Sequence, residues 1–485
     1  MFKNLCNEEK IYKNLYNGEW VESSTNKLIE VKSPVDGQLI GKIQAVSKEE
    51  VDKAIANTKE AGKAWAKTPM YERTKILNKV AELLDARCEE IADILVAEIG
   101  KDKRSSVSEV KRTADYIRFT ANLGESLEGE SLSGDRFPGG SKKKLCLVER
   151  VPLGTVLAIA PFNYPVNLAA SKIAPALIGG NTVLLKPPSQ GAISGLYLAA
   201  VFNEAGLPKG VLNTITGKGS EIGDYVVTHP GIDFINFTGS SDVGQHITEI
   251  SSKTPLMLEL GGKDAAIVLE DADLENVAED IVLGAYSYSG QRCTAVKRIL
   301  ATNEVADKLV PMLKEKIEAL KVGNPNEDVT IVPLIDDKSA DFVQGLIDDA
   351  MEKGATLVTG NKREKNLIYP TLFDNVTVDM RIAWEEPFGP VLPIIRVKDV
   401  DEAIDIANRS EYGLQSSVFT KDINKAFYIA KQLEVGVVQI NNKPERGPDH
   451  FPFLGVKASG MGTQGIGYSI EAMTRHKVIV MNLDI

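Results

Sequence analysis

Two short segments near the middle of the chain carry residue types that can pass an acyl group through sulfur. Glu259 lies in the sequence LELGGK at 258–263, and Cys293 lies in GQRCT at 290–294. An ionised cysteine attacks a carbonyl carbon readily, and the resulting thioester needs a base that activates water. Taken alone, each segment is more typical of a packed thiol or a surface carboxylate. Covalent catalysis is therefore a hypothesis that the rest of the chain must support.

The composition limits the class of protein. A length of 485 residues suggests two or three domains, and 43% apolar with 25% charged residues is typical of a soluble globular protein. The net charge of −11 argues against binding to nucleic acid or an anionic membrane, so an anionic substrate would need a local cluster of arginines.

The cysteines and the N-terminus indicate the compartment. The chain contains no CxxC pair, which predicts a reduced intracellular protein without disulfides or a metal site. The four cysteines are Cys6, Cys88, Cys146 and Cys293. The first residues lack the apolar core of a signal peptide, and no apolar run approaches the roughly 20 residues of a membrane span. We therefore expect a cytoplasmic protein.

Helical patterns dominate the N-terminal part. Ser47 and Glu50 have the spacing of a capping box and predict the start of a helix. Apolar residues at helical spacing predict a second helix from Tyr71 to Ile99, which Gly100 ends.

Strands and helices then alternate. The first series has predicted strands at 156–160, 182–185, 211–215 and 234–237, and predicted helices at 166–178, 192–205, 219–228 and 243–251. A second series runs from Leu260 to about residue 445, with predicted strands at 265–269, 298–301 and 391–396. This order predicts an α/β fold with two doubly wound parallel sheets, whose ligands bind at the carboxyl ends of the strands.

Two more segments are strand-like but lie outside these series. Residues 144–150 alternate like an exposed strand, and residues 477–481 are also strand-like. An isolated ribbon is only marginally stable, so each strand needs a partner. We expect a small β flap that serves oligomerisation.

Two glycine-containing turns suggest an anion site without identifying the anion. No strand is followed by GxGxxG, and the glycines of 217–223 are spaced differently. Residues 239–244 have the gap of a Walker loop, but Gln245 and His246 follow in place of Lys and Ser/Thr, which argues against ATP. Backbone N–H groups at such strand-to-helix turns favour an anion, although plain turns remain an equally good interpretation.

Seven motifs in order identify a family. They are PFNYP at 161–165, LKPPS at 185–189, FTGS at 237–240, LELGG at 258–262, GQRC at 290–293, EEPFGPV at 385–391 and FLGVKASG at 453–460. This series closely resembles the aldehyde dehydrogenase superfamily over nearly the whole chain. The resemblance implies a cofactor-binding domain (1–126 and 148–258), a catalytic domain (259–465) and an oligomerisation flap (127–147 and 466–485). It also suggests a homotetramer.

The resemblance implies roles for three residues. Cys293 would be the nucleophile toward an aldehyde. The Asn163 amide and the N–H of Cys293 would stabilise the oxyanion. Glu259 would be the base for the deacylating water, and its presence favours hydrolysis over transfer to coenzyme A. The four histidines match no catalytic motif.

The resemblance also implies NADP as cofactor. Lys186 would meet the adenosine ribose or its phosphate, Gly239 and Ser240 the pyrophosphate, and Glu386 and Phe388 the nicotinamide riboside. Ser189 stands where NAD-preferring relatives commonly carry a glutamate, so repulsion of a 2′-phosphate is removed. The remaining implied contacts are Ala160, by its backbone only, Gly219, Asp224 and Leu260.

Three arginines point to the substrate. Arg112, Arg292 and Arg446 lie in segments that flank the substrate tunnel in the family, where guanidinium groups suit a phosphate. With Asn163, Tyr164, Cys293 and Thr294 they form the expected substrate site. The resemblance, taken with these arginines, implies oxidation of D-glyceraldehyde 3-phosphate to 3-phosphoglycerate with NADP⁺ and water, without inorganic phosphate.

Two alternatives remain open at this point. The chain is then either an aldehyde dehydrogenase for another small aldehyde or semialdehyde, or a catalytically silent nucleotide-binding protein. The joint presence of Cys293, Glu259 and Asn163 argues against the silent protein.

Overall fold

The first of two α/β bodies is built on a six-stranded sheet. The computed structural model describes residues 4–126 and 128–483. The strand order is β10-β9-β8-β11-β12-β24, and the first five strands are parallel. These strands are β8 (Thr155–Ile159), β9 (Thr182–Lys186), β10 (Leu212–Thr214), β11 (Phe234–Thr238) and β12 (Leu256–Glu259), with β24 (Gly460–Met461) antiparallel at the edge. The predicted parallel sheet is confirmed.

The second body is built on a seven-stranded sheet with the order β15-β18-β19-β14-β13-β21-β22. Every neighbouring pair is parallel except β15 with β18. Its strands are β13 (Ala265–Val268), β14 (Arg298–Thr302), β15 (Thr356–Thr359), β18 (Thr371–Asp374), β19 (Val391–Val397), β21 (Gln415–Phe419) and β22 (Val437–Ile440). The second predicted sheet is confirmed as well.

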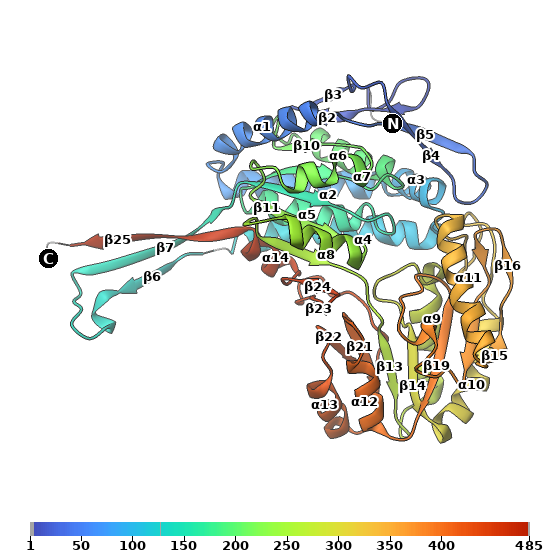
Figure 1. The fold of residues 1–485 in the computed structure, drawn as a ribbon. Coiled ribbons are helices and arrows are strands. Elements are labelled where there is room, and N and C mark those ends of the chain that lie inside the picture. The colour runs from blue at the N-terminus through green and yellow to red at the C-terminus, as the bar shows by residue number, and fades with distance from the viewer. Residues whose placement is uncertain (1–3, 127, 484–485) are drawn as a thin grey trace.

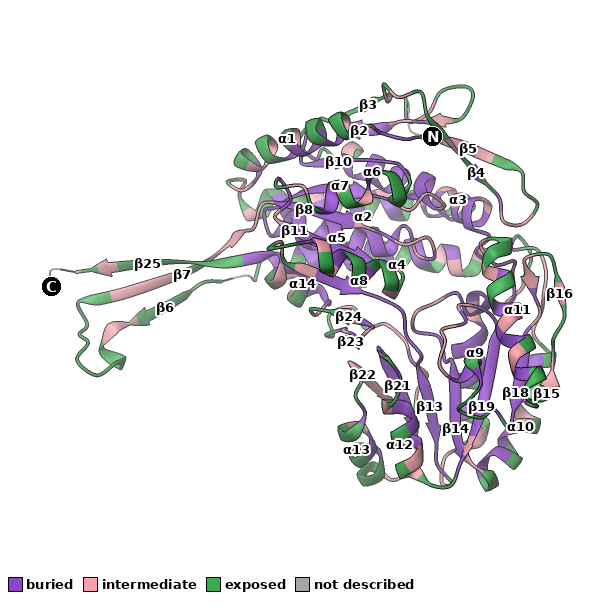
Figure 2. Ribbon diagram, viewed as in Figure 1, coloured by how far each residue is buried: buried purple, intermediate pink, exposed green. Residues whose placement is uncertain are grey.

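Helices cover both sheets, and burial follows the layers. The central strands are buried, whereas the outer helices expose one side (Figure 2). The first sheet is packed by α5 (Asn167–Ile178), α6 (Ala192–Glu204), α7 (Gly219–Val227) and α8 (Ser241–Ile250). The second body contains α9 (Leu274–Tyr286), α10 (Asn303–Glu318), α11 (Asp337–Glu352), α12 (Val400–Asn408) and α13 (Ile423–Gln432). Within the described ranges, no helix has the length and apolar character needed to cross a bilayer.

The N-terminal helices agree with the sequence only in part. The capping box is confirmed at α1 (Lys48–Trp65), where the Ser47 hydroxyl accepts from the Glu50 N–H at 3.2 Å and Glu50 accepts from the Ser47 N–H at 2.8 Å. The single helix predicted from Tyr71 to Ile99 is wrong. The chain breaks at Arg87 into α2 (Met70–Ala86) and α3 (Cys88–Ile99), and the Arg87 guanidinium binds Glu204 of α6. Gly100 ends α3 at φ 64°, as predicted.

Several N-terminal elements have no clear signal in the sequence. The helix α4 (Lys103–Gly124) buries polar side chains on its inner face, among them Ser106, Glu109 and Thr113, which obscures its apolar period. Five short strands precede α1 and form two small sheets. They are β1 (Ile11–Tyr12), β2 (Asn14–Tyr16), β3 (Glu19–Val21), β4 (Leu28–Lys32) and β5 (Leu39–Gln44).

A three-stranded antiparallel arm projects from the first body (Figure 1). Its strands are β6 (Glu130–Ser133), β7 (Lys144–Pro152) and β25 (Thr474–Asn482). The two strands expected outside the sheets therefore pair with each other, from Thr474 opposite Pro152 to Asn482 opposite Lys144.

The expected flap boundaries need correction. The helix α14 (Ile466–Ala472), assigned to the flap, instead packs against α4 and α5, because Ile466 and Ile470 belong to the core of the first body. β24, assigned to the catalytic domain, pairs with β12 of the first sheet. Residues 1, 127 and 485, which bound the expected segments, lie outside the described residues.

Candidate active site

Three loops from the two bodies bring the predicted catalytic residues together. Asn163 lies between β8 and α5, Glu259 ends β12, and Cys293 lies between η2 (Ser287–Gly290) and β14. The Asn163 amide nitrogen donates to the carbonyl oxygen of Gln291 at 3.0 Å, which fixes it beside the cysteine loop. Glu259 is close enough for its charge to act on the Cys293 thiol.

The loop that delivers Cys293 is held in a demanding conformation. Tyr288, Ser289 and Gly290 have φ values of 52°, 53° and 70°, a left-handed run that side chains other than glycine rarely adopt. The Ser289 hydroxyl donates to the carbonyl of Val332 at 2.7 Å and accepts from its N–H at 2.8 Å. A Cβ at Gly290 would lie 2.5 Å from the carbonyl oxygen of Gly389. The surrounding structure therefore imposes the bend that places the thiol.

The Cys293 thiol is protonated at neutral pH in the free protein. Burial and the negative charge of Glu259 raise its pKa to about 12, against the attraction of Lys297. Lys297 donates to the Cys293 carbonyl oxygen and pairs with Glu386 at 3.0 Å. The cation is thus anchored on the cysteine backbone, and it links Cys293 to a predicted cofactor residue.

Glu259 is held by partners on both sides. The Arg446 Nη1 donates to both carboxylate oxygens, at 3.0 and 2.9 Å, and its Nη2 donates to Gln464 at 2.7 Å. The Thr238 hydroxyl lies 3.3 Å from Glu259, and Lys172 donates to that hydroxyl at 2.6 Å. Burial lowers the pKa of Lys172 to about 7.

Lys172 and Gln464 were missed in the sequence. Lys172 is the one ionisable residue of α5, whose sequence is otherwise almost entirely apolar. A charged residue inside a buried helix is costly without a partner, so this was a usable signal. Gln464 offered no comparable signal.

Two of the three predicted substrate arginines, Arg112 and Arg446, lie against Asp449. Arg112 binds Asp449 through two hydrogen bonds, at 2.9 and 2.8 Å, and donates to the carbonyl oxygen of Arg446 at 2.7 Å. Arg292 instead donates to the carbonyl oxygens of Leu283 and Gly284. Each guanidinium therefore has a protein partner that an incoming anion must replace or share.

A cavity of about 740 Å³ opens between the two bodies beside these residues. Arg112 and Tyr164 line it together with Leu283, Ser287 and Tyr288. Arg446 lines a smaller, separate cavity of about 50 Å³ with Asp449 and Phe453. Thr294 is buried next to Cys293. The larger cavity is a route for a small molecule toward the Asn163–Tyr164 loop.

Lys186 fits an anionic ligand. It ends β9 at the carboxyl edge of the first sheet and is 6% exposed. Its ammonium forms no hydrogen bond or ion pair with a described residue, and burial lowers its pKa to about 8. A buried cation without a counter-ion is unfavourable unless an anion binds there. Ser189, three residues further on, is partly exposed and uncharged.

The other predicted cofactor residues lie mainly along the same edge. Ser240 caps α8, and Gly239 precedes it directly after β11, so free N–H groups of a helix N-terminus face this edge. The Ala160 N–H donates to the Lys186 carbonyl oxygen, Leu260 packs against Gly244, and Gly219 begins α7. Asp224 is exposed and binds His246 at 2.9 Å.

Glu386 and Phe388 come from the second body. Glu386 accepts from the Gly262 N–H at 3.2 Å, and the Phe388 ring lies 5.9 Å from the ring of Phe162. Phe388 has a φ of 46°, so its placement is imposed by its surroundings. Both side chains therefore lie at the junction between the bodies.

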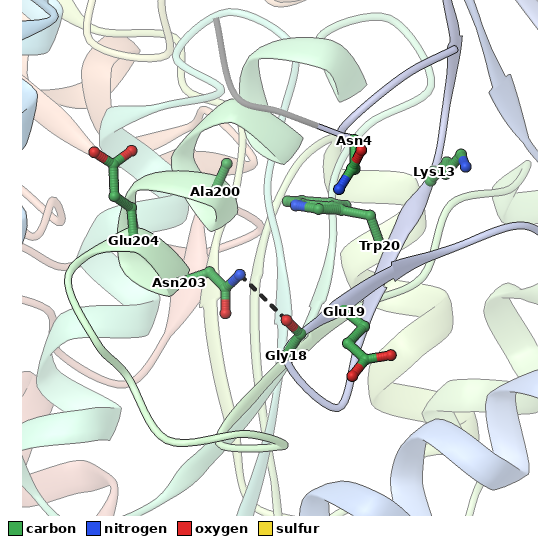
Figure 3. A pocket seen from close by; sticks show the side chains of 8 residues that line it. All are labelled: Asn4, Lys13, Gly18, Glu19, Trp20, Ala200, Asn203 and Glu204. Atoms are coloured by element: carbon green, nitrogen blue, oxygen red, sulfur yellow. Dashed lines mark hydrogen bonds between the residues drawn. The ribbon is translucent and has the colours of Figure 1, made fainter.

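A further cavity of about 550 Å³ lies elsewhere on the first body. Figure 3 shows Trp20 of β3 facing α6 across it, with the Asn203 amide donating to the Gly18 carbonyl oxygen at 3.3 Å. None of the predicted site residues lines this cavity, and it adjoins Asn4, next to the residues that are not described. We assign it no role in the site.

Comparison with known proteins agrees with this arrangement. The profile of the aldehyde dehydrogenase family matches residues 20–479. The chain is 58% identical to the NADP-dependent glyceraldehyde-3-phosphate dehydrogenase of Streptococcus equinus, covering 98% of this chain and 99% of that protein. It is 52% identical to the protein of that name from Pisum sativum, covering 98% and 96%.

A solved structure is similar throughout. The NADP-dependent glyceraldehyde-3-phosphate dehydrogenase of Bacillus halodurans C-125, complexed with NADP, superposes with a TM-score of 0.96 at 57% identity. The match covers 97% of this chain and 99% of that chain. The family profile and the relatives extend over both bodies and the arm. The chain belongs to the aldehyde dehydrogenase family.

Proposed function

We propose that this chain oxidises D-glyceraldehyde 3-phosphate to 3-phosphoglycerate with NADP⁺ and water, through a thioester on Cys293 and without inorganic phosphate. The observation that carries the proposal is the convergence of Cys293, Asn163 and Glu259 in a chain 58% identical to an enzyme of that name. The similarity extends over nearly the full length of both proteins.

The first step is loss of the Cys293 thiol proton to water and attack of the resulting thiolate on the aldehyde carbon. The oxyanion that forms needs hydrogen-bond donors already in place. One N–H of the Asn163 amide is committed to the carbonyl of Gln291, and the second remains to donate to the oxyanion. The Cys293 N–H is the other proposed donor. Such a donor is typically worth about 3–4 kcal/mol to the transition state.

The second stage releases the acid. A nicotinamide held at this site would supply the hydride acceptor that converts the thiohemiacetal to a thioester. Glu259 draws a proton from the water that attacks this thioester. Arg446 binds both oxygens of Glu259 in the free protein, so this ion pair must loosen, or the guanidinium must be shared, before Glu259 can accept a proton. A base at this position favours water over coenzyme A as the acyl acceptor.

Lys186 and Ser189 support NADP as the cofactor. The buried Lys186 ammonium has no counter-ion among the described residues, and a 2′-phosphate supplies one. The neutral Ser189 adds no repulsion. Gly239 and Ser240 would hold the pyrophosphate, and Glu386 and Phe388 the nicotinamide riboside.

Arg112, Arg292 and Arg446, with Tyr164, are the proposed binding groups for the substrate phosphate. Arg446 is a poor test of this assignment, because its removal also leaves Glu259 as a buried carboxylate without its counter-ion. Within the described part of the chain, the hydrogen bonds of the Arg292 side chain go to backbone carbonyl oxygens, so its replacement disturbs the base less.

The central experiment mixes purified protein with the triose phosphate and NADP⁺, without inorganic phosphate, and follows the absorbance of NADPH. We expect turnover that is abolished by C293S. R292L should raise KM for the phosphorylated aldehyde by about tenfold or more, because one charge-assisted contact is lost. KM for uncharged glyceraldehyde should change by less than about twofold. Equal effects on both substrates would refute the phosphate assignment. Absence of NADPH formation by the wild type would refute the reaction.

The assembly and its location are further proposals. Val478 and Val480 on the arm are more than half exposed, at 57% and 55%, and Leu132, on the far side of β7 from them, is exposed as well. Apolar side chains on a projecting strand favour contact with a second copy, and we propose a homotetramer. We also propose that the first body binds the cofactor and the second carries the nucleophile. The few unpaired thiols support a cytoplasmic location.

A further inference from the structure

A fully buried ion pair lies behind the Asn163 loop. The Lys101 ammonium and the Glu109 carboxylate are 2.6 Å apart, and both side chains are completely buried. Removing two charges from water is expensive, and the pair is tolerated only where further hydrogen bonds satisfy both groups. The identity of those further partners indicates what the pair does.

Most of the further partners belong to residues 163–167. Lys101 donates to the Asn163 carbonyl oxygen at 3.1 Å, and its ammonium lies 3.3 Å from the centre of the Tyr164 ring. Glu109 accepts from the N–H groups of Val166 and Asn167, both at 3.0 Å. The cation therefore holds one end of the loop and the carboxylate holds the other.

The same anchor reaches the cysteine loop. Lys101 lies 4.9 Å from the centre of the Tyr288 ring, in the left-handed run that precedes Cys293. The Tyr164 and Tyr288 rings meet edge to face, with centres 6.4 Å apart. One ammonium thus contacts both loops whose relative position sets the distance from the Asn163 amide to the thiol.

We propose that the Lys101–Glu109 pair is a positioning device for the oxyanion site, acting through the backbone of Asn163. The inference rests on the proposed role of Asn163 as an oxyanion donor. A donor is effective only where it is fixed to within about 0.5 Å, and displacement by about 1 Å costs on the order of 100-fold in rate. Lys101 and Glu109 touch no reacting atom, so they are positioning residues.

Glu98 provides a matched control. It is also a buried carboxylate, 0% exposed, and it accepts from the N–H groups of Gly191, Ile193 and Ser194 at 3.0, 2.8 and 2.8 Å. The N–H groups that it binds belong to the start of α6 and not to residues 163–167. A purely structural role for Glu109 therefore predicts that E98Q and E109Q behave alike.

The test compares K101M, E109Q, the double variant K101M/E109Q and E98Q. Each variant is made in the full-length protein, and its thermal stability is measured. The rate constant of its pre-steady-state NADPH burst, per active site, is then measured at saturating NADP⁺ and triose phosphate. The double variant removes both charges together, so it should recover much of the stability that K101M loses by stranding Glu109. We expect the rate constant of its burst to stay about 10–100-fold below that of the wild type. The burst rate constant of E98Q should stay within about twofold of the wild-type value, even though the stability of this variant is reduced.

A double-mutant cycle with N163A identifies the route of the effect. If the pair acts through Asn163, K101M/E109Q should slow the burst of N163A by less than about threefold. The inference is overturned if the double variant recovers the burst together with stability, if E98Q slows it equally, or if the loss is undiminished in N163A. If N163A has the same burst as the wild type, the proposed role of Asn163 itself is contradicted. If N163A lowers the burst but K101M/E109Q does not, the inference about the ion pair is overturned and the role of Asn163 stands.

A milder variant decides the matter if the charge variants do not accumulate as folded protein. The Thr113 hydroxyl accepts a hydrogen bond from the Asn167 side-chain amide at 3.2 Å and donates one to the Glu109 carbonyl oxygen at 2.7 Å. T113V removes these contacts while keeping the shape of the side chain. A burst lowered by about threefold or more supports the inference, and an unchanged burst contradicts it.

Discussion

Replacing Glu259 with glutamine should make Cys293 more reactive toward an alkylating reagent in the absence of cofactor. The negative charge of Glu259 is the largest influence after burial that raises the pKa of the thiol to about 12. Glutamine has nearly the same size, and it leaves the Arg446 cation without its nearest carboxylate. Both changes favour the thiolate.

The size of the effect follows from the charge that is removed. Two unit charges roughly 4–8 Å apart interact by about 2–4 kcal/mol at an effective dielectric constant of about 20. Because one pKa unit corresponds to about 1.36 kcal/mol, the pKa of Cys293 should fall by about two pKa units. At pH 8 the thiolate fraction then rises about 100-fold, but a less basic thiolate is less nucleophilic, which leaves about a tenfold faster alkylation.

The assay is the rate of iodoacetamide labelling at Cys293 at pH 8, read by peptide mass spectrometry. C293S identifies labelling at the other three cysteines, and E386Q tests whether any nearby carboxylate has the same effect. A slower rate in E259Q would mean that Glu259 takes the proton from the thiol, and an unchanged rate would mean that its charge does not reach the sulfur. Either result would refute the reasoning.

Three other changes have defined outcomes. S189E should raise KM for NADP⁺ by about 10–100-fold and change KM for NAD⁺ much less, because the carboxylate repels only the 2′-phosphate; equal changes would contradict the site. The pKa of Lys186 is lowered to about 8 in the free protein, and a bound phosphate favours the ammonium, so Kd for NADP⁺ measured by calorimetry should be flat below pH 8 and rise toward tenfold per unit above it. K186M should abolish that slope, and a slope that persists would exclude Lys186. V478D/V480D should lower the molar mass seen in analytical ultracentrifugation without loss of secondary structure, because two charges on the exposed face of β25 oppose its burial; an unchanged mass would exclude the arm as the contact.

The sequence was sufficient for the fold class and for a proposal of which groups react. The alternating apolar runs correctly predict both parallel sheets, because buried parallel strands need continuous apolar residues. The seven motifs assign Cys293, Glu259 and Asn163 to one site through the resemblance to the family. Helix boundaries were predicted less well: the apolar period runs on through the break at Arg87, whose guanidinium binds Glu204 more than a hundred residues away.

The tertiary structure decided how these groups are held. Composition and spacing did not indicate that Arg446 binds Glu259 or that Arg112 binds Asp449, and these contacts change what an arginine substitution measures. They also did not indicate that Lys101 and Glu109 lie behind Asn163, since α4 hides its polar inner face among ordinary surface residues. The physical reason is that residue types follow from local patterns, whereas charge pairing and burial depend on which distant segments the sheets bring side by side.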